Sequence, residues 1–269
     1  MSESETATAQ RKAVIVTGAS DGIGAELARV FAARGHEVAL VARRKERLDA
    51  LADDIAAAGA PRPLVVGLDL AEPGAPQALD EALEQAGLAP EILVNNAGYG
   101  LMGAAAELDE AEQLGVVDLN IRALTALTLR FLPPIIAAKG AVLNVASVAA
   151  MMPGPHFAVY YASKAYVLSF SEALSEEMKP HGVKVSCLCP GQVATGFQER
   201  ARFDFSGTMR AMKPAVISAA EVARQGYEGL MAGQRVIIPG AVTKILAASS
   251  RATPNALLLP LLAAVQRRR

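Results

Sequence analysis

The chain has 269 residues, and its 27 acidic and 26 basic side chains give a formal net charge of −1. This balance leaves no excess of positive charge to hold a nucleic-acid backbone, so nucleic acid is not an expected partner. Hydrophobic residues make up 52% of the chain, which is enough for one large apolar core. The first ten residues are polar and predict a disordered leader. No apolar run reaches the ~20 residues of a membrane-spanning helix, so we expect a cytoplasmic protein.

The pattern of cysteine and histidine residues does not indicate a metal site. Cys187 and Cys189 would point to the same face of a strand, and we interpret them as two small core side chains. The three histidines are scattered, without the spacing of metal ligands. We therefore expect neither a disulfide framework nor a bound metal.

Short apolar runs alternate with helical patterns along almost the whole chain. The predicted strands are Ala13–Thr17, Val38–Val41, Leu64–Gly67, Ile92–Asn95, Ala141–Val145, Val183–Leu188 and Arg235–Ile238. The predicted helices lie at about Ile23–Ala33, Arg44–Ala58, Ala75–Ala86, Glu110–Phe131 and Tyr160–Met178. Continuously apolar strands are typical of a parallel sheet that is covered on both faces. The pattern predicts an α/β fold, a single doubly wound, Rossmann-like parallel sheet of about seven strands with helices on both faces.

A glycine-rich turn, Thr17–Gly24, connects the first predicted strand to the first predicted helix. Glycines at such a turn allow a tight bend and a close approach of the backbone to a pyrophosphate, which the free N–H groups of the helix then bind. A turn that is rich in glycine only to close the chain is the alternative. The predicted cofactor contacts here are Gly18, Ser20, Gly22, Ile23 and Gly24.

The end of the second predicted strand indicates which dinucleotide binds. An acidic residue at this point binds the ribose 2′-hydroxyl and repels a 2′-phosphate, but here Ala42 is followed by Arg43 and Arg44. Guanidinium groups match a phosphate ester in charge and in bidentate geometry, so the sequence favours NADP(H). The alternative is that the two arginines simply begin a solvated helix. Asp69 and Leu70, after the third strand, are placed to meet the adenine edge.

Further motifs follow in a fixed order along the chain. They are N-N-A-G at Asn95–Gly98, Asn120, Ser147, Y-x-x-x-K at Tyr160–Lys164, and Pro190-Gly191 with Thr195 four residues later. Together with T-G-x-x-x-G-x-G at the first turn, they cover roughly Lys12 to Ile238. With these motifs the chain resembles the short-chain dehydrogenases/reductases. The resemblance implies that residues 11–240 form a dinucleotide-binding and catalytic domain, which residues 241–269 extend.

The resemblance also implies a role for each matched residue. The implied catalytic residues are Asn120, Ser147, Tyr160 and Lys164. The implied further cofactor contacts are Asn96, Ala97 and Gly98 on the adenine-ribose side, Tyr160, Lys164, Pro190, Gly191 and Val193, and Thr195 on the nicotinamide carboxamide. By the same resemblance we expect a homodimer or homotetramer, built on helices Glu110–Phe131 and Tyr160–Met178. The chain departs from the family pattern at Asp21, where NADP-preferring members often carry a base, and at Tyr161, which doubles the tyrosine.

The predicted set can manage the proton of a carbonyl reduction. A free tyrosine has a pKa of ~10 and is a slow acid–base near neutrality. Lys164 lies one helical turn beyond Tyr160, so its positive charge favours the phenolate. Ser147 follows the fifth strand, and its hydroxyl is placed to bind the substrate oxygen. We therefore expect an NADP(H)-dependent oxidoreductase of carbonyl and alcohol groups, with Tyr160 as general acid and base.

Substrate and partners are less closely defined by the sequence. The candidate substrate lining is apolar and favours a lipophilic ketone or alcohol; it comprises Tyr99, Met102, Met151, Met152, His156, Phe157 and Phe197. The segment Gln192–Ser218 has the position of a mobile lid. The apolar tail Pro254–Arg269 is interrupted by Pro260 and ends in three arginines. It is interpreted either as a cover for another subunit or for the chain's own cleft, or as a peripheral anchor on anionic lipid.

Two other functions fit parts of the pattern. Nucleotide-sugar epimerases share Y-x-x-x-K, but their glycines are spaced differently and they have a large second lobe for which no chain remains. An NADP(H)-sensing regulatory protein without catalysis would be expected to lose part of the catalytic set, which is complete here.

Overall fold

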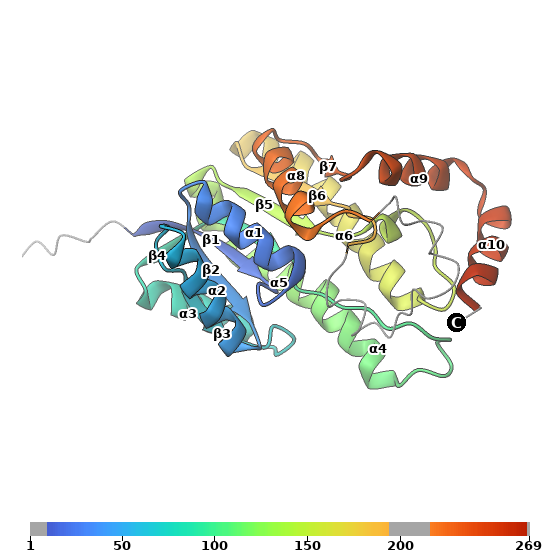
Figure 1. The fold of residues 1–269 in the computed structure, drawn as a ribbon, viewed down its shortest axis with the longest axis horizontal. Helices are drawn as coiled ribbons and strands as arrows, with labels where there is room; N and C mark the ends of the chain where they lie inside the picture. The colour runs from blue at the N-terminus through green and yellow to red at the C-terminus, as the bar shows by residue number, and fades with distance from the viewer. Residues whose placement is uncertain (1–9, 194–215, 268–269) are drawn as a thin grey trace, which may run out of the picture.

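The fold is a seven-stranded sheet in which every strand pairing is parallel (Figure 1). The computed structural model describes residues 10–193 and 216–267. The strands are β1 (Arg11–Thr17), β2 (Glu37–Ala42), β3 (Leu64–Gly67), β4 (Leu88–Asn95), β5 (Ala141–Val145), β6 (Lys184–Leu188) and β7 (Val236–Ile237). Their order, β3-β2-β1-β4-β5-β6-β7, reverses between β1 and β4. The predicted doubly wound parallel sheet is confirmed.

Helices cover both faces of this sheet, as the continuously apolar strands predict. On one face α1 (Gly22–Ala33), α2 (Lys45–Ala57) and α8 (Ala219–Met231) pack against the sheet. On the other face lie α3 (Ala75–Gln85), α5 (Leu124–Ala138) and α6 (Ala158–Met178). Alternation along β1 separates the two cores, since Val14 and Val16 join the first and Ile15 joins the second. The sequence analysis did not predict α8, which begins after the N-capping residue Ser218.

The long helix after β4 is not regular, although the sequence predicted one helix over Glu110–Phe131. It consists of α4 (Glu110–Val117), a π-helical turn over Asp118–Ala123, and α5. Glu110–Ala138 is long and apolar enough to cross a membrane by composition alone, contrary to the expectation from the sequence. However, Phe131 and Ile135 are fully buried in the core under the sheet. One face of the segment therefore lies in the core, and a π turn interrupts its regular helix.

Two helices follow the sheet at the end of the molecule beyond β7 (Figure 1). They are α9 (Ala241–Ala252) and α10 (Asn255–Arg267). The sequence was interpreted as broken at Pro260, but α10 continues through this residue. Proline removes one backbone donor and costs helix stability without always ending a helix. Leu257 and Leu261, one turn apart on α10, are 68% and 63% exposed.

The carboxyl ends of the central strands form one edge of the sheet. Parallel registers pair Val16 with Val94, Asn95 with Asn144, and Val145 with Leu188, so β1, β4, β5 and β6 end side by side. In open α/β sheets the crevice at this edge, where the strand order reverses, is where ligands bind. The functional residues predicted from the sequence follow these strand ends.

Candidate active site

The glycine-rich turn is tightly packed against the loop after β4. Gly18 has a φ of 66°, a conformation that favours glycine. A Cβ atom at Gly18 would lie 2.8 Å from the Cα of Ala97, so a side chain does not fit. Asp21 caps helix α1 and accepts a hydrogen bond from the N–H of Gly22 at 2.7 Å. The turn therefore brings bare backbone and a helix N-terminus to the edge of the sheet, as a pyrophosphate requires.

Thr17 and Asn96 hold this turn in place. The buried hydroxyl of Thr17 donates to the carbonyl of Val94 at 3.0 Å and accepts from the N–H groups of Asn96 and Ala97 at 2.9 and 3.1 Å. The amide of Asn96 donates to the carbonyls of Thr17 and Gly18 at 2.9 and 3.2 Å. These bonds connect the two loops, and the predicted contact of Asn96 with the cofactor stays a prediction.

Positively charged side chains gather beside the turn. An Nη2 atom of Arg44 donates to the hydroxyl of Ser20 at 3.0 Å, and Arg43 forms an ion pair with Asp69 at 3.5 Å. The structure thus pairs Arg44 with Ser20 of the turn, and Arg43 with Asp69 after β3. The side chain of Leu70 is buried in the core, and its predicted contact with the cofactor stays a prediction. Because Leu70 is a large apolar residue below a strand end, packing determines its position.

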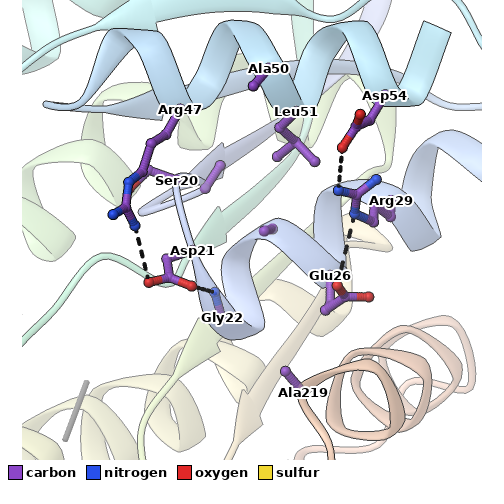
Figure 2. Close-up of a pocket in the computed structure, with 12 residues that line it drawn as sticks. Ser20, Asp21, Gly22, Glu26, Arg29, Arg47, Ala50, Leu51, Asp54 and Ala219 are labelled. Carbon is purple, nitrogen blue, oxygen red and sulfur yellow. Dashed lines mark hydrogen bonds and ion pairs between the residues drawn. The ribbon is translucent and has the colours of Figure 1, made fainter. Parts of the chain in front are cut away.

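An arginine that was not predicted also faces the turn. Arg47, in the first turn of α2, forms an ion pair with Asp21 at 3.5 Å, and Figure 2 shows the two side chains pointing at each other. The signal for it in the sequence was weak, because a basic residue near a helix start is commonly only solvated. Arg47 and Asp21 line an open pocket of about 450 Å³ between α1 and α2.

Tyr160 and Lys164 lie on the buried side of α6, with exposed fractions of 8% and 6%. The ammonium of Lys164 donates to the carbonyl of Val145, at the end of β5, at 2.9 Å. Its nitrogen lies 5.8 Å from the ring centre of Tyr160. Burial lowers the pKa of Lys164 to about 8, because removal from water disfavours the charged form. The lysine can therefore respond to a change of charge nearby at close to neutral pH.

Ser147 links the end of β5 to the tyrosine. Burial raises the pKa of Tyr160, and a hydrogen bond with Ser147 acts in the opposite direction. The hydroxyl of Ser147 also accepts from the N–H of Ala149 at 3.2 Å, because Ser147 caps the short 3-10 turn Val148–Met151. The capping bond orients the hydroxyl. The structure thus places Ser147 in hydrogen-bonding contact with the proposed acid.

Asn120 occupies the π-helical turn and reaches the loop after β4. Its Oδ1 accepts from the N–H of Tyr99 at 3.0 Å, while its Nδ2 donates to the carbonyl of Tyr99 and to the hydroxyl of Ser163, both at 2.9 Å. A Cβ at Gly98 would lie 2.9 Å from this Oδ1 and 3.4 Å from Nζ of Lys164. Gly98 therefore leaves the room in which Asn120 and Lys164 approach each other. The resemblance to the short-chain dehydrogenases further implies that Asn120 anchors a water that leads protons to Lys164, and this role stays a prediction.

Two further residues of the site were not assigned their present roles from the sequence. Ser163 is fully buried, and its hydroxyl connects Asn120 to the carbonyl of Tyr160. The only indication of this role in the sequence was the position of Ser163 between the tyrosine and the lysine of Y-x-x-x-K. Phe157, expected to contact substrate, stacks on Tyr160 with ring centres 4.5 Å apart. The stacking excludes water from one side of the phenol and contributes to its burial.

The other predicted substrate residues are partly accounted for. Met102 packs against the cluster formed by Ala149, Phe157 and Tyr160. Tyr99, Met151, Met152 and His156 are half-buried. Phe197 and Thr195 lie outside the described residues, as does most of the expected lid Gln192–Ser218. The ring of Tyr161 lies 6.1 Å from that of Tyr160 and is packed over Gly154, where a Cβ would lie 2.5 Å from it.

The structure describes only some of the residues that were predicted to lie at the nicotinamide end of the cofactor. The carbonyl of Pro190, just beyond β6, accepts from the N–H of Val148 at 3.0 Å and so joins the two loops. Gly191 packs closely against Thr243 of α9, since a Cβ there would lie 2.8 Å from the threonine hydroxyl. Val193 is buried and forms an isolated parallel bridge with Ile217. These residues border the same strand-end edge as Ser147.

Comparisons with known proteins agree with this geometry. The short chain dehydrogenase family profile matches residues 12–204. A short chain dehydrogenase of Pseudocercospora fijiensis is 40% identical over 190 residues, which are 68% of this chain and 60% of that protein. The matches to the first four curated relatives span only 56–60% of the length of those proteins.

Solved structures show the same fold with different bound cofactors. A short-chain dehydrogenase from Sphingobium yanoikuyae in complex with NADPH superposes with a TM-score of 0.76 at 33% identity, covering 86% of this chain and 88% of that one. A relative from Burkholderia phymatum in complex with NAD has a TM-score of 0.77 at 26% identity and covers 89% and 92%. With its family profile, parallel sheet and strand-end residues, the chain belongs to the short-chain dehydrogenase family.

Proposed function

We propose that this protein is an NADP(H)-dependent oxidoreductase that interconverts a carbonyl group and a secondary alcohol, with Tyr160 as the general acid and base. The observation that supports this most directly is the group formed at the carboxyl end of β5 by the half-buried Ser147 and the buried Tyr160 and Lys164. These three residues come from two elements, and their side chains meet where a substrate oxygen would lie.

The residues divide the handling of the proton. When bound, the nicotinamide cofactor supplies or accepts the hydride. In reduction, the phenol of Tyr160 donates its proton to the substrate oxygen, which becomes the hydroxyl of the alcohol. Ser147 donates a hydrogen bond to that oxygen while negative charge develops on it. The ammonium of Lys164, 5.8 Å from the phenol ring centre, stabilises the phenolate that remains. Oxidation of an alcohol reverses these steps.

The preference for the phosphorylated cofactor is proposed from the charges at the end of β2. An acid that would bind a free ribose 2′-hydroxyl is replaced by the buried Ala42, and Arg43 and Arg44 follow it. The contact of Arg44 with Ser20 holds one guanidinium beside the glycine-rich turn. Such a group pairs with a phosphate through two parallel hydrogen bonds. The NADPH in the Sphingobium relative is consistent with this proposal.

The proposed substrate is a lipophilic ketone or alcohol. The apolar side chains of Met102 and Phe157 pack against Tyr160, and Met151 lies nearby on the turn after Ser147. Methionine adapts its shape to different apolar ligands. A sugar or a phosphate ester would leave polar groups without partners against these side chains.

The first experiment measures cofactor binding, since it does not depend on the substrate. The purified protein is titrated with NADPH and with NADH while nicotinamide fluorescence is followed. We expect tighter binding of NADPH, and then turnover of at least one lipophilic carbonyl in a substrate panel. Tighter binding of NADH would contradict the proposed cofactor. Binding of neither, or binding of NADPH without turnover of any carbonyl or alcohol, would contradict the proposed reaction.

We also propose that two copies associate through the surfaces of α5 and α6. Leu129 on α5 and Tyr166 on α6 are exposed, and the Tyr166 hydroxyl lies 2.9 Å from that of Thr125, so the two helices form one surface. Large exposed apolar side chains on adjacent helices are typical of subunit interfaces. Light scattering should give a dimer or larger assembly for the wild type and a monomer for Leu129→Glu. A monomeric wild type would contradict this association.

A further inference from the structure

Asp21 is poorly suited to a site for NADP(H). Ser20, whose hydroxyl accepts from Arg44, and Asp21 line the same pocket between α1 and α2, so we take the carboxylate to lie near the place proposed for the 2′-phosphate. Two negative groups this close repel each other. The carboxylate also has a structural task, because Asp21 caps α1 by accepting from the N–H of Gly22. An unpaired Asp21 would therefore weaken the binding of NADPH and leave that of NADH nearly unchanged.

Arg47 offsets this charge from the neighbouring helix. One guanidinium nitrogen of Arg47 lies 3.5 Å from Oδ2 of Asp21, while the other carboxylate oxygen, Oδ1, accepts the capping bond (Figure 2). Arg47 is placed one turn into α2, close behind Arg43 and Arg44. One short segment thus supplies three arginines: Arg44 contacts Ser20 and Arg47 contacts Asp21 in the glycine-rich turn, while Arg43 pairs with Asp69.

The remaining charges of this pocket are paired with one another. Arg29 of α1 lies 2.9 Å from Asp54 of α2 and 3.8 Å from Glu26, and Figure 2 shows it between the two acids. These three residues line the same pocket as Asp21 and Arg47. Arg29 therefore provides a control, since it has the same charge and lines the same pocket but is paired with other acids.

We propose that Arg47 determines cofactor specificity by neutralising Asp21, so that a 2′-phosphate is accepted next to an acidic helix cap. Arg47 acts through Asp21 and is a positioning residue. The inference rests on the proposed preference for NADP(H). It also explains how the chain binds a phosphate with an acid where NADP-preferring relatives often carry a base.

The test is a double-mutant cycle on cofactor affinity. Dissociation constants for NADPH and NADH are measured by fluorescence for the wild type, Arg47→Ala, Asp21→Asn, the double variant and Arg29→Ala. Asparagine caps helices about as well as aspartate, so Asp21→Asn removes the charge and retains the cap. Arg47→Ala should weaken NADPH binding roughly fivefold and change NADH binding less than about twofold. The double variant should regain most of the NADPH affinity, and Arg29→Ala should resemble the wild type. Thermal unfolding establishes that each variant is folded.

The outcomes separate this inference from the proposed function. If the wild type prefers NADPH and Arg47→Ala binds it equally well, the role of Arg47 is wrong and the proposed function stands. The same conclusion follows if Arg47→Ala weakens the binding of NADPH and of NADH equally. It also follows if adding Asp21→Asn to Arg47→Ala does not restore the binding of NADPH. If the wild type prefers NADH, the proposed cofactor and this inference fail together.

Discussion

The ammonium of Lys164 lies 5.8 Å from the ring centre of Tyr160, and burial acts on their two pKa values in opposite directions. Burial favours the uncharged form of each group, so it raises the pKa of the phenol and lowers that of the ammonium. A phenolate at Tyr160 would favour the charged ammonium of Lys164, and the ammonium would favour the phenolate, because opposite charges attract. The pair is therefore suited to a reaction in which the phenol gives up its proton while the ammonium is present.

The first prediction distinguishes the two adjacent tyrosines. Tyr160→Phe removes the proposed proton donor and should lower kcat for carbonyl reduction by about 10²–10⁴-fold. Its affinity for NADPH should change little. Tyr161→Phe is the matched control, because its ring packs over Gly154 and Phe retains that ring. Steady-state kinetics and cofactor titration measure both effects, and equal losses of kcat in the two variants would refute the assignment.

The second prediction concerns the pH dependence of the reaction. Reduction requires a protonated Tyr160 and a charged Lys164, and the pKa of Lys164 is lowered to about 8. The rate of carbonyl reduction should therefore be steady at neutral pH and fall as the pH rises through about 8. It is measured as kcat from pH 6 to 10 with saturating cofactor. Lys164→Arg keeps its charge throughout, so its rate should lack this fall even where it is lower overall.

The third prediction concerns stability and the same lysine. In the unfolded chain its pKa is close to the ordinary 10.5, and in the folded protein it is about 8. Between these pH values the unfolded chain binds more protons, so the contribution of Lys164 to the free energy of unfolding rises with pH. Lys164→Met lacks this contribution. The free energy of unfolding of both proteins is measured by urea unfolding without cofactor. From pH 8 to 10, the value for the wild type should rise relative to the value for the variant. A constant difference would show that the pKa is not lowered.

The fourth prediction tests the space at Gly98. The Cβ atom of Gly98→Ala would lie 2.9 Å from Oδ1 of Asn120, so the asparagine must move away from Tyr99. We expect a loss of kcat of at least about tenfold, because a displacement of this size disturbs catalytic geometry. Gly74→Ala is the control, since nothing lies within 4 Å of a Cβ at that position. Normal activity of Gly98→Ala would show that this close packing is not needed.

The fifth prediction concerns the C-terminal segment. Residues 241–269 contain five basic residues and no acid, and Leu257 and Leu261 on α10 are exposed. A basic segment with an exposed apolar face is typical of binding to anionic lipid surfaces. We expect the full chain to float with vesicles that contain anionic lipid, and a chain lacking residues 254–269 to float less. Neutral vesicles are the control. Unchanged flotation after the deletion would exclude an anchor, and a smaller assembly after the deletion would favour a contact with another subunit.

Local patterns in the sequence determined the elements and much of the site. Apolar runs without alternation predict strands covered on both faces, and the spacing of four between Tyr160 and Lys164 places them on one side of α6 whatever the rest of the fold. The glycine-rich turn lies between a strand and a helix in the sequence itself. These predictions were correct because each depends only on residues within one or two helical turns of each other.

Tertiary structure decided the relations between distant segments. The sequence did not indicate the π-helical turn that carries Asn120, the closeness of Gly98 to Asn120 and Lys164, or the use of the Asn96 amide to tie down the first turn. It also did not pair Arg47 with Asp21, which lie 26 positions apart. Such contacts depend on how the helices pack against the sheet and on which backbone groups remain to be bonded, so residues far apart in the chain jointly determine them.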